Sequence, residues 1–291
     1  MNKWLSARVA LVAACMWVLF SATAFALPAM WLAHKGDTRI WLFGSVHLLP
    51  PGIEWRSEIL ESALQNADTV YFEAIVDLED PGADAREAMG KYLVPSGSRL
   101  LDLLTPEERE LVAWAAKEVG APLSGLNIFR PWVAAEVLAT FLAARQGFDF
   151  AAGVDVTLQG EVSRNKLRAF ETLADQFAFF DEIPADQQIA YLLSTAKGIQ
   201  TTPDALKAIV ANWAAGKPEE IAENVADDLG TGGSTDDILL HRRNARWLEE
   251  LKTLLGEPGD TLVVVGAAHL AGDGSLVDLL EAEGLTIERV Q

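Results

Sequence analysis

Runs of apolar and β-branched residues occur near both ends of the chain and once in its middle, and their length is typical of strands. The turn sequence Lys35-Gly36-Asp37 separates the first two runs, which predicts two strands joined by a tight connection. The predicted strands are residues 30–34, 38–45, 69–72, 167–170, 261–265 and 285–290.

Apolar residues at helical spacing occupy most of the remaining chain. The sequence Thr105-Pro106-Glu107-Glu108 predicts a helix start, with a capping hydroxyl, a proline at the first position and acidic residues near the positive end of the dipole. Pro131 predicts another helix that runs to Arg145, whereas Gly198 and Gly216 predict interruptions. The helical stretches are residues 54–67, 81–147, 153–164, 173–255 and 275–283, with a loose stretch at 230–235.

The order of these elements predicts an α/β (α+β) fold. Its central mixed sheet would be built from the N- and C-terminal segments, and the mostly helical middle, about residues 81–255, would be a large insertion over that sheet. Residues 27–291 are long enough for a single domain with its own core.

The first residues have the pattern of a secretory signal peptide. Lys3 and Arg8 precede an apolar stretch at residues 9–20, and Ala24-Phe25-Ala26 is a small-residue cleavage site. The apolar stretch is too short to cross a bilayer, so no stable membrane span is expected. Removal of residues 1–26 predicts a periplasmic or secreted protein.

Cys15 is the only cysteine, and it would end a lipobox at residues 12–15, which is the alternative to cleavage near Ala26. A chain cleaved near Ala26 has no cysteine, which excludes thiolate metal sites and cysteine nucleophiles. Without Lys3 and Arg8 it has 42 acidic residues against 21 basic ones. That balance argues against nucleic acid and anionic lipid as partners. The oligomeric state stays open.

The pattern Gly-x-x-His occurs at the ends of two predicted strands, as Gly44-Ser45-Val46-His47 and as Gly266-Ala267-Ala268-His269. Two further predicted strands end on Glu73 and Glu171. If these strands are parallel, all four ionisable side chains fall at the carboxyl edge of the sheet, where open α/β sheets bind ligands.

Two imidazoles and carboxylates without thiols suit one divalent metal ion (Zn, Mn, Fe or Co), which would polarise a carbonyl or activate water. Without a metal, the same groups would form a histidine–glutamate base that activates water directly. Both interpretations predict a hydrolase with a peptide or small-molecule substrate.

A longer ordered set of motifs accompanies these histidines. It comprises Phe43-Gly-Ser-Val-His47 with Leu49-Pro50, Val70-Tyr-Phe-Glu73, Gly153-Val-Asp155, Phe170-Glu-Thr172 with Gln176 and Phe180, Arg243-Asn244, and Val264-Val-Gly-Ala-Ala-His-Leu270 with Gly272. In these motifs, over essentially the whole chain after the signal peptide, the protein resembles the TraB/GumN family. That family is related to the TIKI proteins and, more distantly, to erythromycin-esterase-like hydrolases and ChaN-like heme-binding lipoproteins.

The family's hallmark is two Gly-x-x-His motifs with a Glu and an Arg, which by position are His47, His269, Glu73 and Arg243. TIKI members look like divalent-metal-dependent proteases. The resemblance therefore implies a metallopeptidase-like hydrolase acting on peptide bonds, with Mn, Co or Zn held by His47, His269 and Glu73. Glu73 or Glu171 would move the proton, and Arg243 would stabilise the oxyanion. The alternatives are a metal-free esterase-like hydrolase with a histidine base and a non-catalytic protein that binds a peptide or heme-like ligand.

Each of these side chains has a structural alternative. Glu73 could merely form a cap or pair with an arginine near the sheet edge, and Arg243 could pair structurally with Glu73. Glu171 could bind the metal, orient an imidazole or cap the following helix. Asp155 lies in the first turn of a predicted helix, where a carboxylate favours the dipole without further function. Structural places are also expected for His34 and His241 at the surface and for Trp41, Trp132 and Trp247 in the core.

Overall fold

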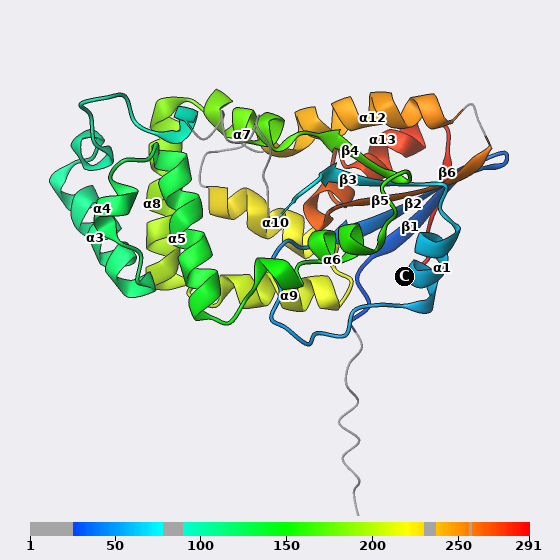
Figure 1. Ribbon diagram of the computed structural model, residues 1–291, viewed down its shortest axis with the longest axis horizontal. Helices are drawn as coiled ribbons and strands as arrows, with labels where there is room; N and C mark the ends of the chain where they lie inside the picture. The colour runs from blue at the N-terminus through cyan, green and yellow to red at the C-terminus, as the bar shows by residue number, and fades with distance from the viewer. Residues whose placement is uncertain (1–25, 78–89, 230–236, 256–257) are drawn as a thin grey trace, which may run out of the picture.

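The computed structural model describes residues 26–77, 90–229, 237–255 and 258–291 (Figure 1). Within them, one mixed sheet has the strand order β4-β3-β5-β2-β1-β6. The strands are β1 (Met30–Lys35), β2 (Thr38–Ser45), β3 (Thr69–Ala74), β4 (Leu167–Glu171), β5 (Gly259–Gly266) and β6 (Thr286–Arg289). The predicted α/β class with a central mixed sheet is confirmed.

The four strands that end on the candidate residues are parallel to one another. β5 lies between β2 and β3, and β4 pairs with the outer side of β3. The register places Ser45 opposite Gly266 and Ala74 opposite Glu171, so these strands end together. β1 and β6 extend the other side of the sheet by antiparallel pairing. The expectation of a shared carboxyl edge is therefore confirmed.

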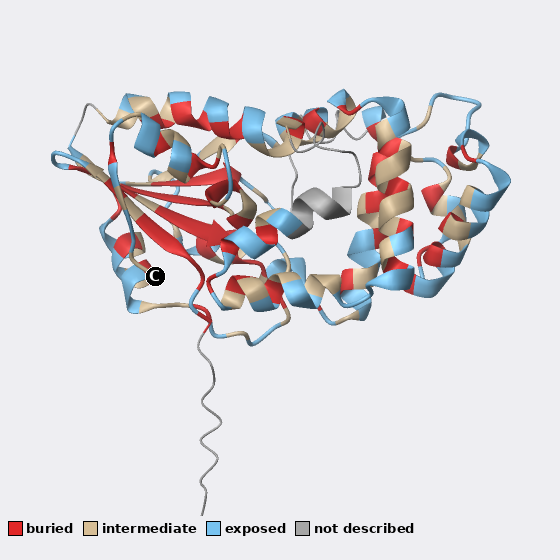
Figure 2. Ribbon diagram, turned by 180° about the vertical axis from the view of Figure 1, so that it is seen from behind, coloured by how far each residue is buried: buried red, intermediate tan, exposed pale blue. Residues whose placement is uncertain are grey.

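Helices cover both faces of the sheet, and Figure 2 shows the strands buried along much of their length. One face packs its side chains, including Phe43, Phe72 and Val264, against helices that carry Leu60, Leu158 and Trp213. The other face packs against Trp247, Leu251 and Leu276. The covering helices are α1 (Glu58–Asn66), α6 (Val154–Glu161), α9 (Ala205–Ala214), α10 (Pro218–Leu229), α12 (Arg242–Leu254) and α13 (Leu276–Ala282).

A second group of helices extends beyond the sheet and has its own apolar core (Figure 1). Its predicted starts are confirmed: Thr105 caps α3 in a reciprocal capping box with Glu108, and Pro131 opens α5. The helices of this group are α3 (Pro106–Val119), α4 (Leu123–Leu126), α5 (Pro131–Arg145) and α8 (Ala185–Thr201), and α7 (Leu173–Glu182) connects it to the sheet. Four short 3-10 helices are η1 (Gly90–Tyr92), η2 (Leu100–Leu103), η3 (Phe150–Ala152) and η5 (Ala267–Leu270) in the described residues, and η4 (Asp237–His241) is a short π-helix.

Some predicted helix limits were wrong. α1 begins at Glu58 rather than at residue 54, because the Ser57 side chain accepts a hydrogen bond from the Leu60 amide and caps the helix there. Gly198 does not interrupt α8, where Ala196 and Ile199 on either side of it are buried in the helical core. α6 ends at Glu161 rather than at residue 164.

Other predicted segments are loops in the structure or lie outside the described residues. Residues 93–99 contain no helix, although the helical pattern was expected to extend over all of residues 81–147. Apart from Ala26, the predicted signal peptide lies outside the described residues, as does the whole of the loose stretch at 230–235. Among the helices of the described residues, none is long and apolar enough to cross a membrane.

The start of α6 leaves no room for a side chain at Gly153, where an added Cβ would lie 2.2 Å from the carbonyl oxygen of His47. We expect Gly153→Ala to lower the free energy of unfolding by about 1–3 kcal/mol, because backbone must move to admit the methyl group. Gly160→Ala, in the same helix with open space around it, should be neutral or stabilising by up to about 1 kcal/mol. Urea unfolding measures both, and equal stability of Gly153→Ala and the wild type would contradict the packing described.

Candidate functional site

A cleft of about 520 Å³ opens at the carboxyl edge of the parallel strands. Its walls combine charged and apolar side chains from the sheet, α5, α6, α7, η4 and α12. The polar and charged lining residues are His47, Glu73, Glu136, Asp155, Gln176 and Arg243. The large apolar ones are Val76, Phe150, Leu173, Phe177, Phe179, Phe180, Leu239 and Leu240. Such an apolar cavity with a few convergent polar groups is typical of a small-ligand site.

Arg243 joins two buried carboxylates beneath this cleft. Its Nη2 donates to Glu73 Oε2 at 2.5 Å and to Glu171 Oε2 at 2.8 Å, and its Nε also donates to Glu171. Both glutamates are at most 8% exposed. The indole of Trp247 donates to Glu171 Oε1 at 2.9 Å. The guanidinium therefore holds α12 against the ends of β3 and β4 through charge-assisted hydrogen bonds.

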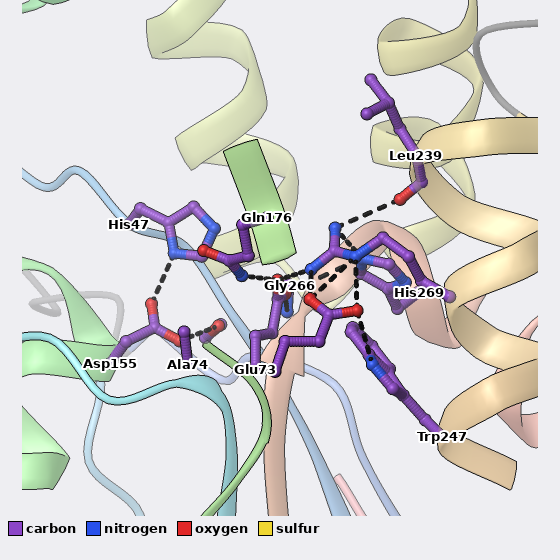
Figure 3. A network of polar contacts seen from close by, with 12 residues as sticks. His47, Glu73, Ala74, Asp155, Gln176, Leu239, Trp247, Gly266 and His269 are labelled. Carbon is purple, nitrogen blue, oxygen red and sulfur yellow. Dashed lines mark hydrogen bonds and ion pairs between the residues drawn. The ribbon is translucent and has the colours of Figure 1, made fainter. Parts of the chain in front are cut away.

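Glu73 is ionised despite its burial. Burial alone would raise the pKa of this carboxyl, but the adjacent Arg243 guanidinium overrides that effect and holds the pKa well below its usual range. The Gly266 amide donates to Glu73 Oε1 at 2.7 Å, and the Gln176 amide donates to Oε2 at 3.2 Å (Figure 3). The carboxylate thus links the ends of β3 and β5.

His269 is buried and neutral. Asn244 donates through Nδ2 to the Gly274 carbonyl, so its Oδ1 faces His269 Nδ1 at 2.6 Å and must accept from it. Burial lowers the pKa of His269 to about 3. Its other nitrogen, Nε2, is therefore unprotonated, and it lies 3.4 Å from Arg243 Nη1 and 3.7 Å from Glu73 Oε1.

His47 has a different environment, because its side chain is 54% exposed whereas that of His269 is 5% exposed. Its Nδ1 lies 2.8 Å from Asp155 Oδ2, and Ser45 Oγ donates to the other oxygen of Asp155 at 2.8 Å. The Asp155 carboxylate raises the pKa of His47 to about 9. Figure 3 shows this pair on the side of the network away from His269 and Trp247.

The expected metal ligands do not fit a divalent ion in this arrangement. Among the described residues, no group of three or more His, Cys, Asp or Glu side chains is placed to hold a metal. His269 Nε2 and Glu73 Oε1 approach each other, but the Arg243 guanidinium, a permanent cation, contacts both residues. The ligand set of His47, His269 and Glu73 for Mn, Co or Zn stays a prediction.

The structure gathers Glu73, Glu171, Arg243 and His269 into one hydrogen-bonded network. Glu171 pairs with Arg243 and does not cap α7, because that cap is Thr172. The oxyanion role expected for Arg243 stays a prediction, although each nitrogen of its guanidinium already faces a hydrogen-bond acceptor. His241 is exposed and His34 partly buried, and among the tryptophans Trp132 and Trp247 are buried and Trp41 is partly buried.

Three contributors were not assigned from the sequence. Ser45 lies within the first Gly-x-x-His motif and Asn244 follows Arg243, but neither residue type by itself indicates that it orients a neighbouring site residue. Glu136 had a signal, because it is the one acidic residue in the helix Pro131–Arg145 and the only charged one before Arg145 at the helix end. A charge in the apolar part of such a helix indicates either a buried pair or a binding site.

The fold and the site define an α/β protein with a histidine–carboxylate cleft at the carboxyl edge of its sheet. The chain belongs to the TraB/PrgY/gumN family, whose family model matches residues 29–289. It is 25% identical over 268 residues to the uncharacterized protein YbaP of Escherichia coli (strain K12), covering 91% of this chain and 96% of YbaP. YbaP of Shigella flexneri has the same identity and coverage. No solved structure matches the chain.

Replacing Arg243 should destabilise the fold. We expect Arg243→Met to lower the free energy of unfolding by about 3–5 kcal/mol at pH 8, because two buried carboxylates lose their counter-ion. In the folded wild type the pKa of Glu73 is lowered, so its ionised form adds to the free energy of unfolding. This contribution is complete above the ordinary glutamate pKa and is lost as pH falls through the lowered pKa. In the variant the buried carboxylates protonate readily, so the difference from the wild type should shrink on acidification.

Arg246→Met is the matched control, since the Arg246 side chain is 56% exposed and lies 3.8 Å from Glu171. It should cost less than about 1 kcal/mol. Urea unfolding of both variants at pH 8 and pH 5 measures these effects. A loss for Arg243→Met that is no larger than that for Arg246→Met would contradict the role of the guanidinium.

Removing the Asp155 carboxylate should lower the pKa of His47. In Asp155→Asn we expect the pKa of His47 to fall from about 9 toward 6.5. The raised pKa stabilises the wild-type fold fully below 6.5 and loses this effect as pH rises through about 9, so the two proteins should converge in stability across that window. NMR titration of the imidazole protons measures the pKa, with Asp149→Asn as the control of equal charge change. An unmoved His47 titration in Asp155→Asn would contradict the pairing.

Proposed function

We propose that this protein is a hydrolase in which His47, oriented by Asp155, moves the proton when water attacks an ester or amide carbonyl. The observation that carries the proposal is the contrast between its two motif histidines. His47 lines the cleft and has Nδ1 held by a buried carboxylate, so its Nε2 is left for the reacting groups. His269 has both ring nitrogens within the network beneath the cleft.

The neutral imidazole of His47 takes the proton from the attacking water, and Asp155 stabilises the imidazolium that results. The same imidazolium then gives its proton to the leaving group. With a pKa of about 9, His47 carries a proton at pH 7, so the base form accumulates as pH rises. Arg243 lines the cleft and places a fixed positive charge beside the developing oxyanion, even though its N–H groups already have acceptors.

A metal-dependent hydrolase acting on peptide bonds is the second candidate. The tautomer of His269 favours it, because Nδ1 donates to Asn244 and the unprotonated Nε2 faces Glu73. A histidine oriented in this way by its far nitrogen is common among metal ligands. Metal binding would require Arg243 to move away from Glu73, since the guanidinium now neutralises that carboxylate.

Export is part of the proposal. The basic start, the apolar stretch and the Ala24-Phe25-Ala26 sequence support cleavage near Ala26 and a periplasmic or secreted hydrolase. The acidic balance of the chain agrees with a soluble substrate rather than with nucleic acid.

Turnover of chromogenic esters and amides at pH 9 tests the chemistry. We expect His47→Ala to lower kcat/KM by about 10²–10⁴, as is typical for the loss of a general base, and His34→Ala on β1 to leave it within about twofold. Wild-type turnover should survive a chelator. Activity that needs added Mn, Co or Zn would favour the second candidate. Folded wild-type protein without turnover under any of these conditions would favour a protein that only binds its ligand.

A further inference from the structure

Glu136 is a carboxylate of the cleft that the proposed reaction does not use. It lies on α5 and lines the same cleft as Glu73 and His47, and the neighbouring α5 side chains Trp132, Val133 and Leu138 are buried. The hydroxyl of Tyr191 on α8 donates to its Oε1. Within the described part of the chain, no hydrogen bond reaches Oε2 and no Lys, Arg or His forms an ion pair with Glu136.

The other charges of the cleft are already compensated. Arg243 pairs with both Glu73 and Glu171, Arg246 also lies 3.8 Å from Glu171, and His47 pairs with Asp155, so three cations face these three carboxylates. Among the described residues, Glu136 is therefore the carboxylate of the cleft without an ion-pair partner. Burial raises its pKa, and the Tyr191 hydrogen bond and the charge of His47 oppose that effect only in part. A desolvated carboxylate of this kind is costly unless a binding partner supplies the charge.

The remaining surface of the cleft is apolar and aromatic. Phe150, Phe177 and Phe180 line it, and Phe180 stacks on Trp132 with ring centroids 4.9 Å apart, which fixes the aromatic wall next to Glu136. Aromatic side chains pack against apolar groups and also stabilise cations over their faces. An anionic ligand would face Glu136 and Glu73, whereas an ammonium would complete the charge balance.

We propose that the cleft takes a ligand with an apolar or aromatic group and a primary ammonium, and that Glu136 binds the ammonium. Glu136 would thus determine substrate specificity without moving a proton in the reaction. The inference rests on the proposed function to the extent that the bound ligand is the substrate of the hydrolase.

Calorimetric titration with 4-phenylbutylamine and with the isosteric alcohol 4-phenylbutan-1-ol, at pH 7.5, tests this selectivity. A charge-assisted hydrogen bond is worth about 1.5–3 kcal/mol, so the wild type should bind the amine at least about tenfold more tightly than the alcohol. Glu136→Gln keeps a partner for the Tyr191 hydroxyl and should abolish that preference while the alcohol binds as before. Glu118→Gln, an exposed position on α3, removes the same charge and should leave the preference intact.

Equal affinity of the wild type for the two probes, or a preference that survives in Glu136→Gln, would overturn the inference. Glu136→Asp provides a second variant if Glu136→Gln does not fold, and its shortened carboxylate should reduce the preference without reversing it. Different results contradict the hydrolase and the ligand class. An amine preference without turnover would support the ammonium ligand and contradict the hydrolase. Turnover without an amine preference would support the hydrolase and contradict the ammonium ligand.

Discussion

The arrangement of the site depends on one guanidinium between two buried carboxylates. Arg243 comes from α12, whereas Glu73 and Glu171 come from the ends of adjacent parallel strands, so the ion pairs fix the position of the helix on the sheet. Without the guanidinium, two like charges would be buried side by side. With its charge balanced by Arg243, the ionised Glu73 accepts a hydrogen bond from the amide of Gly266 and holds the end of β5 in place.

The histidines of the two Gly-x-x-His motifs have different surroundings, because only the second lies against Arg243. The second Gly-x-x-His motif places His269 against Arg243, Asn244 and the ring of Trp247, where burial favours the neutral imidazole. The first motif places His47 at the cleft, where Asp155 favours the imidazolium. One histidine therefore belongs to the support of the site, and the other is available to a ligand.

Much of the framework could be predicted from the sequence, because strands and helix starts follow local rules. The apolar runs before His47, Glu73, Glu171 and His269 located the strands, and parallel pairing brought their ends to one edge. The partners of each side chain could not be predicted in this way. The contact of Arg243 with both glutamates depends on how α12 lies over the sheet, which no local pattern records.

What the sequence left open or predicted wrongly has the same origin. The helix dipole accounts for a carboxylate in the first turn of α6, so nothing in the sequence required the contact of Asp155 with His47. Gly198 was expected to interrupt a helix, but burial of its neighbours in the helical core outweighs the low helix propensity of glycine. Tertiary packing decides such cases.

Arg243 balances the charge of Glu73 beside the neutral His269, in the place where a metal ion was expected. Elemental analysis of wild-type protein purified without chelator or metal-affinity tag tests it most directly, with the His47→Ala/His269→Ala double variant as the comparison. Because Arg243 occupies this place, we expect far less than one Mn, Co or Zn ion per chain in both proteins, before and after incubation with these metals. Stoichiometric metal in the wild type that disappears in the double variant would contradict it.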